Sequence, residues 1–175
     1  MKKLRFLLLD ANVVIELFEL RLWPQIIERC EVLLAETVVN EARYCEAGEE
    51  QRRIDLSQDI QENRVTVVRV EISAIEAFRG QFDPTYFERI DPGEAESLAY
   101  MLLSSDPCFL CSSDAIVFRI LGRLNRGEQG LSLEEALDRI GLSRALPSQF
   151  RKEARDRWTK QGEQDMIRGT GMERP

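Results

Sequence analysis

The stretch Arg5-Phe6-Leu7-Leu8-Leu9-Asp10-Ala11-Asn12 decides the fold, because an apolar run of strand length ends on a carboxylate. Such a strand places its terminal acid at the carboxyl edge of a sheet, where open α/β folds build their sites. The chain contains no histidine, which removes the commonest general base and the commonest nitrogen ligand for metals. Hydrolytic chemistry would therefore depend on carboxylates, and this favours a hard divalent cation as cofactor.

The composition is that of an ordinary globular protein. The 175 residues suit one α/β domain with an appended segment, with 43% hydrophobic and 31% charged residues. The net charge of −7 argues against a nonspecific coat on nucleic acid but allows a local RNA site. The apolar run near the N-terminus is too short for a signal peptide, and no stretch has the length of a membrane span. We therefore expect a cytoplasmic protein with no membrane partner.

The four cysteines, Cys30, Cys45, Cys108 and Cys111, include a single close pair. A zinc ribbon needs two such pairs, so buried, reduced thiols are the expected state.

Strand-like and helix-like segments alternate along the chain, which predicts a mostly parallel sheet with helices on both faces. The predicted strands span residues 4–9, 31–34, 65–70 and 109–111. The predicted helices span residues 11–20, 24–30, 37–47, 49–63, 73–78, 94–104 and 115–124, with Thr37 as the N-cap of the third.

The sequence changes character after Gly127. A helix begins after Ser132, an expected N-cap, and a charge-rich amphipathic segment spans residues 147–167. The last eight residues are expected to be frayed. This divides the chain into an α/β domain over residues 1–126 and a helical C-terminal extension over residues 127–175.

Several acids stand where strands end or helices begin. Asp10 and Asp114 each follow a predicted strand, and Glu94 and Glu96 open the helix after Pro92-Gly93. Taken singly, each has a structural explanation as a helix cap or a first-turn acid. Spacing alone does not choose between Glu94 and Glu96.

Glu41 has a different position, because the predicted helix places it on the same face as Val38, Ala42 and Cys45. A carboxylate that faces a core is unfavourable unless it is paired with a cation. Either a salt bridge to a nearby arginine or a bound metal would satisfy it.

Together, Asp10, Glu41, Glu94 and Asp114 are expected to meet at one edge of a parallel sheet. Neighbouring carboxylates repel one another and cannot all remain ionised without a cation. Ligands that offer only oxygen suit Mg²⁺ or Mn²⁺, which activate water and bind phosphate during in-line displacement. Asn12 could orient Asp10 or contact a bound water, although a turn residue would look the same.

At this level the chain resembles the PIN-domain ribonucleases in four motifs. These are Leu8-Leu9-Asp10-Ala11-Asn12-Val13-Val14-Ile15, Glu36-Thr37-Val38-Val39-Asn40-Glu41-Ala42, Gly93-Glu94-Ala95-Glu96-Ser97-Leu98-Ala99 and Leu110-Cys111-Ser112-Ser113-Asp114. The register of the third motif selects Glu94 as the metal-site acid, with Glu96 auxiliary, and Ser112 supports the site in the fourth. The chain departs from the pattern with Glu at the third acid, with Ser112 for the frequent Thr, and after Gly127.

The resemblance implies a three-layer α/β/α sandwich with four or five strands and Mg²⁺-dependent cleavage of RNA. Many bacterial members are toxins of toxin–antitoxin pairs, the VapC type, which act as homodimers and are blocked by an antitoxin protein. Arg119, Arg123 and Arg126 share a helix face beside Asp114 and are the candidates for RNA contact. A solvated basic face would explain them equally well.

Two other functions fit parts of the pattern. A catalytically inactive PIN-fold binding or scaffold module would keep the fold, although it should have lost at least one of the four acids. A metal-dependent phosphatase of the haloacid-dehalogenase type needs a second aspartate where Asn12 stands. A phospho-receiver domain of similar layered fold needs a lysine after a late strand, and the chain has no such lysine.

Overall fold

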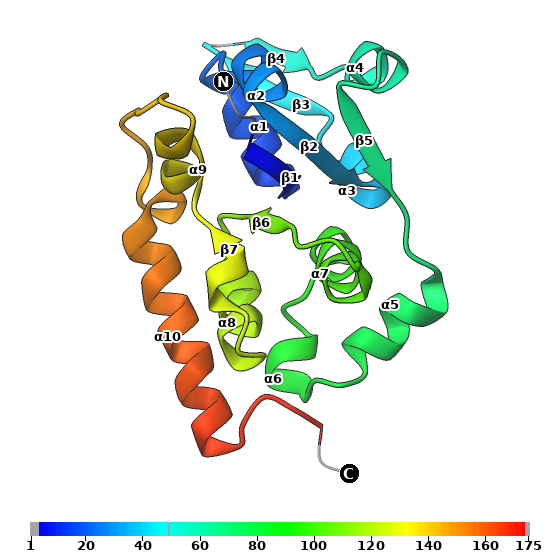
Figure 1. Ribbon diagram of the computed structural model, residues 1–175, viewed down its shortest axis with the longest axis vertical. Helices are drawn as coiled ribbons and strands as arrows, with labels where there is room; N and C mark the ends of the chain where they lie inside the picture. Colours follow the sequence, from blue (N-terminus) through cyan, green and yellow to red (C-terminus); the bar gives the residue numbers. More distant parts are fainter. Residues whose placement is uncertain (1–3, 49, 174–175) are drawn as a thin grey trace.

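The computed structural model describes residues 4–48 and 50–173, which form an α/β fold around a five-stranded parallel sheet (Figure 1). The strand order is β5-β2-β1-β6-β7. The strands are β1 (Leu4–Leu9), β2 (Cys30–Ala35), β5 (Val65–Val68), β6 (Phe109–Cys111) and β7 (Gly130–Leu131). The predicted α/β class and parallel sheet are confirmed, and β7 is a fifth strand that the sequence pattern did not indicate.

The helices cover both faces of this sheet. They are α1 (Ala11–Glu19), α2 (Trp23–Arg29), α3 (Glu36–Glu41), α4 (Ser57–Gln61), α5 (Ile72–Arg79), α6 (Pro84–Phe87), α7 (Pro92–Leu103), α8 (Ala115–Arg123), α9 (Leu133–Arg139) and α10 (Lys152–Arg168), with 3₁₀ turns η1 (Gly127–Gln129) and η2 (Ser148–Phe150). Right-handed crossovers require α1 and α2 on one face and α7 and α8 on the other. The predicted three-layer α/β/α sandwich is confirmed.

β1 is the central strand, and its last three residues present apolar side chains to both faces of the sheet. Leu7, Leu8 and Leu9 have no exposed surface, as expected for a strand covered by helices from above and below. Leu8 pairs with Leu33 of β2, and Leu9 pairs with Cys111 of β6.

The strand order reverses at β1, and this fixes where a site can form. From β1 the chain builds β2 and β5 on one side, and it then returns to place β6 and β7 on the other. The helices that follow β1 and β6 leave in opposite directions, so a crevice opens between the carboxyl ends of these two strands. Asp10 and Asp114 follow these strands.

The segment after α3 differs from the prediction. The helix predicted to reach residue 47 ends at Glu41, and β3 (Tyr44–Ala47) pairs antiparallel with β4 (Glu50–Arg53). Tyr44 lies opposite Arg53, and Cys45 lies opposite Arg52 and is buried. The hairpin packs on α1, and this packing overrides the helix propensity of a stretch rich in Glu, Gln and Arg.

The C-terminal segment packs against the α/β domain, mainly through α10. Ser132 caps α9 through a reciprocal capping box with Glu135, as predicted. α10 runs along α8 on one side of the molecule (Figure 1). The expectation of a frayed end is wrong for residues 171–173, because Met172 bridges Phe82 and the Glu173 amide donates to the Gln81 carbonyl. Residues 174–175 lie outside the described residues.

A buried polar cluster attaches α10 to the rest of the fold. The Asp165 carboxylate accepts hydrogen bonds from the Tyr86 hydroxyl and from Arg119 Nε, both at 2.6 Å. The Arg119 guanidinium also stacks over the Tyr86 ring at 4.8 Å. Asp165 is 3% exposed, so loss of Arg119 would leave a buried charge without a cationic partner, and loss of the Tyr86 hydroxyl would remove one of its hydrogen bonds. Across the described residues, no helix combines the length and apolar character needed to cross a membrane.

The crossing of α8 and α10 predicts a stability effect. A Cβ added at Gly162 would lie 1.9 Å from the Arg119 carbonyl oxygen, and one at Gly122 would lie 2.0 Å from that of Thr159. Gly162→Ala should therefore lower the free energy of unfolding by about 1–3 kcal/mol, measured by denaturant titration. This is opposite to the gain expected for glycine to alanine in an unobstructed helix.

Glu163→Ala is the matched control, because it introduces the same residue at the neighbouring exposed position of α10. A Gly162→Ala protein as stable as this control would contradict the close crossing.

Candidate active site

Asp10 is a buried carboxylate at the end of the central strand. Its side chain is 7% exposed and accepts a hydrogen bond from Ser112 Oγ at 2.8 Å. A weaker bond from the Asn12 amide, at 3.4 Å, caps α1. Burial raises the pKa of Asp10 to about 6, against the opposing effect of the Ser112 hydrogen bond and with a further increase from the charge of Asp114.

Asp114 is joined to Asp10 through two polar side chains. Ser112 Oγ accepts a hydrogen bond from the Asp114 amide while it donates to Asp10, and Asn12 Nδ2 donates to Asp114 Oδ2 at 3.2 Å. Asp114 stands at the N-cap position of α8, yet its side chain makes no capping hydrogen bond. The capping explanation therefore does not account for this acid, and Asn12 and Ser112 contact both aspartates.

Glu94 is the second deeply buried acid. It is 5% exposed and lies in the first turn of α7, in a capping box in which Asp91 Oδ1 accepts from the Glu94 amide and Glu94 Oε2 accepts from the Asp91 amide. Burial raises the pKa of Glu94 well above its usual 4.5, and the charges of Asp91, Asp114 and Asp10 raise it further. Its electrostatic neighbours therefore include both aspartates that follow β1 and β6.

Glu41 reaches the same region from the end of α3 but is not a core residue. The predicted core-facing position is wrong: the side chain is exposed, because α3 ends at Glu41 and Cys45 belongs to β3. Its carboxylate lies against the start of α7, where a Cβ on Gly93 would be 2.6 Å from Glu41 Oε2. Partial burial and the charges of Asp91 and Glu96 raise the pKa of Glu41.

Glu96 has a separate position that the sequence did not indicate. Its carboxylate accepts hydrogen bonds from the Thr37 amide at 2.9 Å, from Thr37 Oγ1 at 2.6 Å and from the Val70 amide at 3.2 Å. Thr37 is therefore not the N-cap of α3, since Ala35 holds that position and Glu96 satisfies the Thr37 amide. Glu96 joins the start of α3 to the segment after β5, which explains its burial without a metal.

The three arginines predicted for RNA contact have partners within the chain. Arg119 pairs with Asp165, Arg123 Nε donates to the Thr170 carbonyl at 2.8 Å, and Arg126 donates to Gln129 Oε1. Arg119 and Arg123 thus hold α10 and the residues after it. Their contribution to RNA binding stays a prediction.

Asp91 is the acid that the sequence reasoning missed. Its charge raises the pKa of Asp10, Glu41 and Glu94, so it interacts electrostatically with groups from three different elements. The segment Asp91-Pro92-Gly93-Glu94 could have indicated Asp91, because its carboxylate stands next to the predicted acid Glu94. The same segment is a typical helix start, with an N-cap residue followed by proline in the first turn, and helix capping alone explains an aspartate there. We refer to Asp10, Glu41, Asp91, Glu94 and Asp114 as the acidic cluster.

The ligand atoms that the acidic cluster offers are of the type that a hard divalent cation prefers. They are carboxylate oxygens, and Asp10 and Glu94 are buried with no ion pair to a cationic side chain in the described part of the chain. Within residues 4–48 and 50–173, however, no three acidic or cysteine side chains are close enough together to hold one ion. The expected convergence of four acids is thus not seen. Mg²⁺ is commonly bound by one or two carboxylates with water and phosphate, and the cluster meets that lower requirement.

No protein-family model matches the chain, and no curated protein matches it. The functional argument therefore rests on the residues of this chain and on their geometry.

The burial of Glu94 predicts how stability depends on pH without divalent cations. Its pKa is higher in the folded than in the unfolded protein, so the folded state loses stability as pH rises above about 4.5. Glu94→Gln removes this penalty, so its melting temperature should exceed that of the unsubstituted protein increasingly between pH 5 and pH 8. A difference of a few degrees is expected, since about 1 kcal/mol corresponds to roughly 2–4 °C at this size.

Glu88→Gln serves as the control, because it removes an exposed carboxylate outside the acidic cluster. Equal differences at pH 5 and pH 8 for Glu94→Gln would show that Glu94 does not carry the expected electrostatic penalty.

Proposed function

We propose that this protein is a metal-dependent ribonuclease that cleaves RNA phosphodiester bonds at the acidic cluster. The observation that carries the proposal is the pair of buried carboxylates, Asp10 and Glu94, which have raised pKa values and no cationic partner among the described residues. A divalent cation removes the electrostatic penalty of such a pair. The four motifs that resemble PIN-domain ribonucleases, and the location at the sheet's switch point, support the same function.

Each residue of the cluster has a role in this proposal. Asp10, Glu94 and Asp114 would hold Mg²⁺ or Mn²⁺ two carboxylates at a time, with water and the substrate phosphate as the other ligands, and Glu41 would bind a water of the ion from the end of α3. When bound, the ion supplies Lewis acidity toward the phosphate oxygens and the attacking water. Ser112 and Asn12 fix the orientation of the Asp10 and Asp114 carboxylates by hydrogen bonds, so little reorganisation is needed on binding.

The proposal extends to the biological setting implied by the same resemblance. The protein would act in the cytoplasm as the toxin of a toxin–antitoxin pair, as a homodimer. An antitoxin protein would block the cluster.

Asp10→Asn tests the assigned chemistry. Cleavage of a labelled single-stranded RNA of mixed sequence in Mg²⁺ should fall by roughly 100-fold or more, the scale seen when one group that stabilises transition-state charge is removed. Stability should be unchanged or increased, because a buried charge is lost while the Ser112 hydrogen bond keeps an acceptor. Gel analysis of the RNA and thermal unfolding give the two readouts.

Asp106→Asn is the control, since Asp106 is an exposed acid outside the cluster. Unchanged cleavage by Asp10→Asn would overturn the role of Asp10.

A second candidate function is a PIN-fold binding or scaffold module without catalysis. The observation in its favour is that no three acidic side chains within the described residues are close enough to share one ion. This candidate and the nuclease differ in the effect of metal alone.

Mn²⁺ without RNA separates the two candidates. An intact site should raise the melting temperature, since a ligand at about 100 times its Kd contributes about 2.7 kcal/mol to stability. Glu94→Gln should abolish most of this shift, while Glu88→Gln should retain it. No shift in the unsubstituted protein would favour the binding module.

A further inference from the structure

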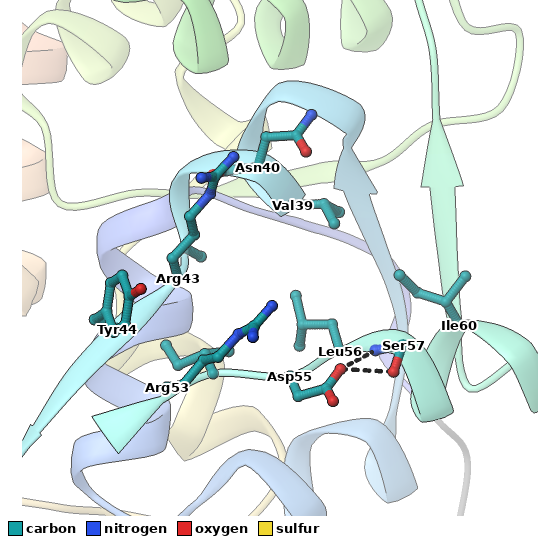
Figure 2. Close-up of a pocket in the computed structure, with 11 residues that line it drawn as sticks. Val39, Asn40, Arg43, Tyr44, Arg53, Asp55, Leu56, Ser57 and Ile60 are labelled. Atoms are coloured by element: carbon teal, nitrogen blue, oxygen red, sulfur yellow. Dashed lines mark hydrogen bonds between the residues drawn. The ribbon is translucent and has the colours of Figure 1, made fainter. Parts of the chain in front are cut away.

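A hollow of about 530 Å³ lies between α3, the β3–β4 hairpin and α4, apart from the acidic cluster. Figure 2 shows its lining, with the Arg53 side chain reaching from β4 toward the residues of α3 and α4. The walls come from three segments of the chain, the last turn of α3, the hairpin and the start of α4. We refer to this hollow as the hairpin pocket.

The rim of the hairpin pocket carries two guanidinium groups, from Arg43 and Arg53. Arg43 Nε donates to the Asn40 carbonyl at 2.5 Å, which fixes the side chain and leaves its terminal nitrogens for other partners. In the described part of the chain, neither arginine forms an ion pair with a carboxylate within 4.0 Å. The acid in the lining is Asp55, whose Oδ1 accepts two hydrogen bonds from Ser57.

The pocket has an apolar floor below a polar rim, and an aromatic ring stands at its edge. Ile54 and Leu56 are buried beneath it, and Val39 and Ile60 line it while half-buried. Tyr44 is 51% exposed and lies directly opposite Arg53 in the hairpin, so the two side chains share one face. A flat ring, an apolar floor and guanidinium groups together suit a nucleotide, whose base stacks while its phosphate accepts hydrogen bonds from arginine.

The pocket adjoins the acidic cluster through α3. Val39, Asn40, Ala42 and Arg43 line the pocket, and Glu41 lies within the same run. Carboxylates without a cation repel a phosphate backbone, and the chain as a whole carries a net charge of −7. A strand of RNA at the cluster would therefore need a cationic anchor nearby. Arg43 follows Glu41, the last residue of α3, by two positions, and Arg53 faces it across the pocket from the end of β4.

We propose that the hairpin pocket binds an unpaired nucleotide of the RNA substrate close to the scissile phosphate, an inference that rests on the proposed ribonuclease function. Arg53 and Arg43 contact the phosphate, and Tyr44 stacks on the base. The pocket thereby restricts the substrate to RNA that is single-stranded next to the cut, because a paired base cannot enter it.

Arg53→Gln tests the pocket by binding rather than cleavage. The Kd for a fluorescent single-stranded RNA, measured by anisotropy in EDTA, should rise about tenfold with the loss of a charge-assisted hydrogen bond. The slope of log Kd against log salt should fall by about 0.7 for one lost phosphate contact. Tyr44→Leu should also raise the Kd for the RNA, and Tyr44→Phe should leave the Kd unchanged because the aromatic ring is kept.

Arg52→Gln is the matched control, because it removes the same charge from the next residue of β4, opposite Cys45 on the other face of the hairpin. Equal weakening by Arg52→Gln and Arg53→Gln would show only nonspecific attraction and would overturn the pocket. Unchanged binding by Arg53→Gln would overturn it as well. Displacement of the RNA by an acidic peptide at equal concentration would assign the pocket to a protein partner instead.

The two proposals fail in different ways. RNA cleavage that depends on Asp10, together with unchanged RNA binding by Arg53→Gln, would leave the ribonuclease standing and remove the pocket. RNA binding that depends on Arg53, without cleavage in Mg²⁺ or Mn²⁺, would remove the ribonuclease and retain the nucleotide site.

Discussion

The burial of negative charge at the carboxyl edge of the sheet is the constraint on which the site depends. Asp10 follows three leucines, Leu7 to Leu9, that have no exposed surface, and Glu94 lies in the first turn of a helix packed against that sheet. Both carboxylates are removed from water without a neutralising arginine or lysine in the described part of the chain. Hydrogen bonds from Ser112 and from the Asp91 amide offset part of the penalty. The rest remains as raised pKa values, which are typical of functional sites.

The fold supplies this arrangement through its topology. Because strand order reverses at β1, the segments after β1 and β6 meet at one crevice, and the start of α7 lies beside them. The capping box that begins α7 also brings Asp91 and Glu94 to this position, so helix capping and site formation use the same residues. Gly93 lets Glu41 approach, because any larger residue there would displace its carboxylate.

Local patterns in the sequence predicted much of this, and long-range contacts decided the rest. The apolar run before Asp10, the strand at Phe109–Cys111 and the capping serine at Ser132 are signals carried by adjacent residues, and all three are confirmed. The hairpin was missed because its exposed residues favour a helix when the packing on α1 is unknown. Arg119 was assigned to RNA because its partner Asp165 lies 46 residues away in the chain.

The close crossing of α8 and α10 has a consequence for the chain as a unit. α8 starts directly after Asp114, and its last turn holds the glycine that contacts α10, while β7 completes the sheet beyond residue 126. Removing residues 127–175 would therefore not leave an intact α/β domain. It would uncover the back of the helix that carries an acid of the site. The C-terminal segment therefore supports α8 and is a structural part of the fold.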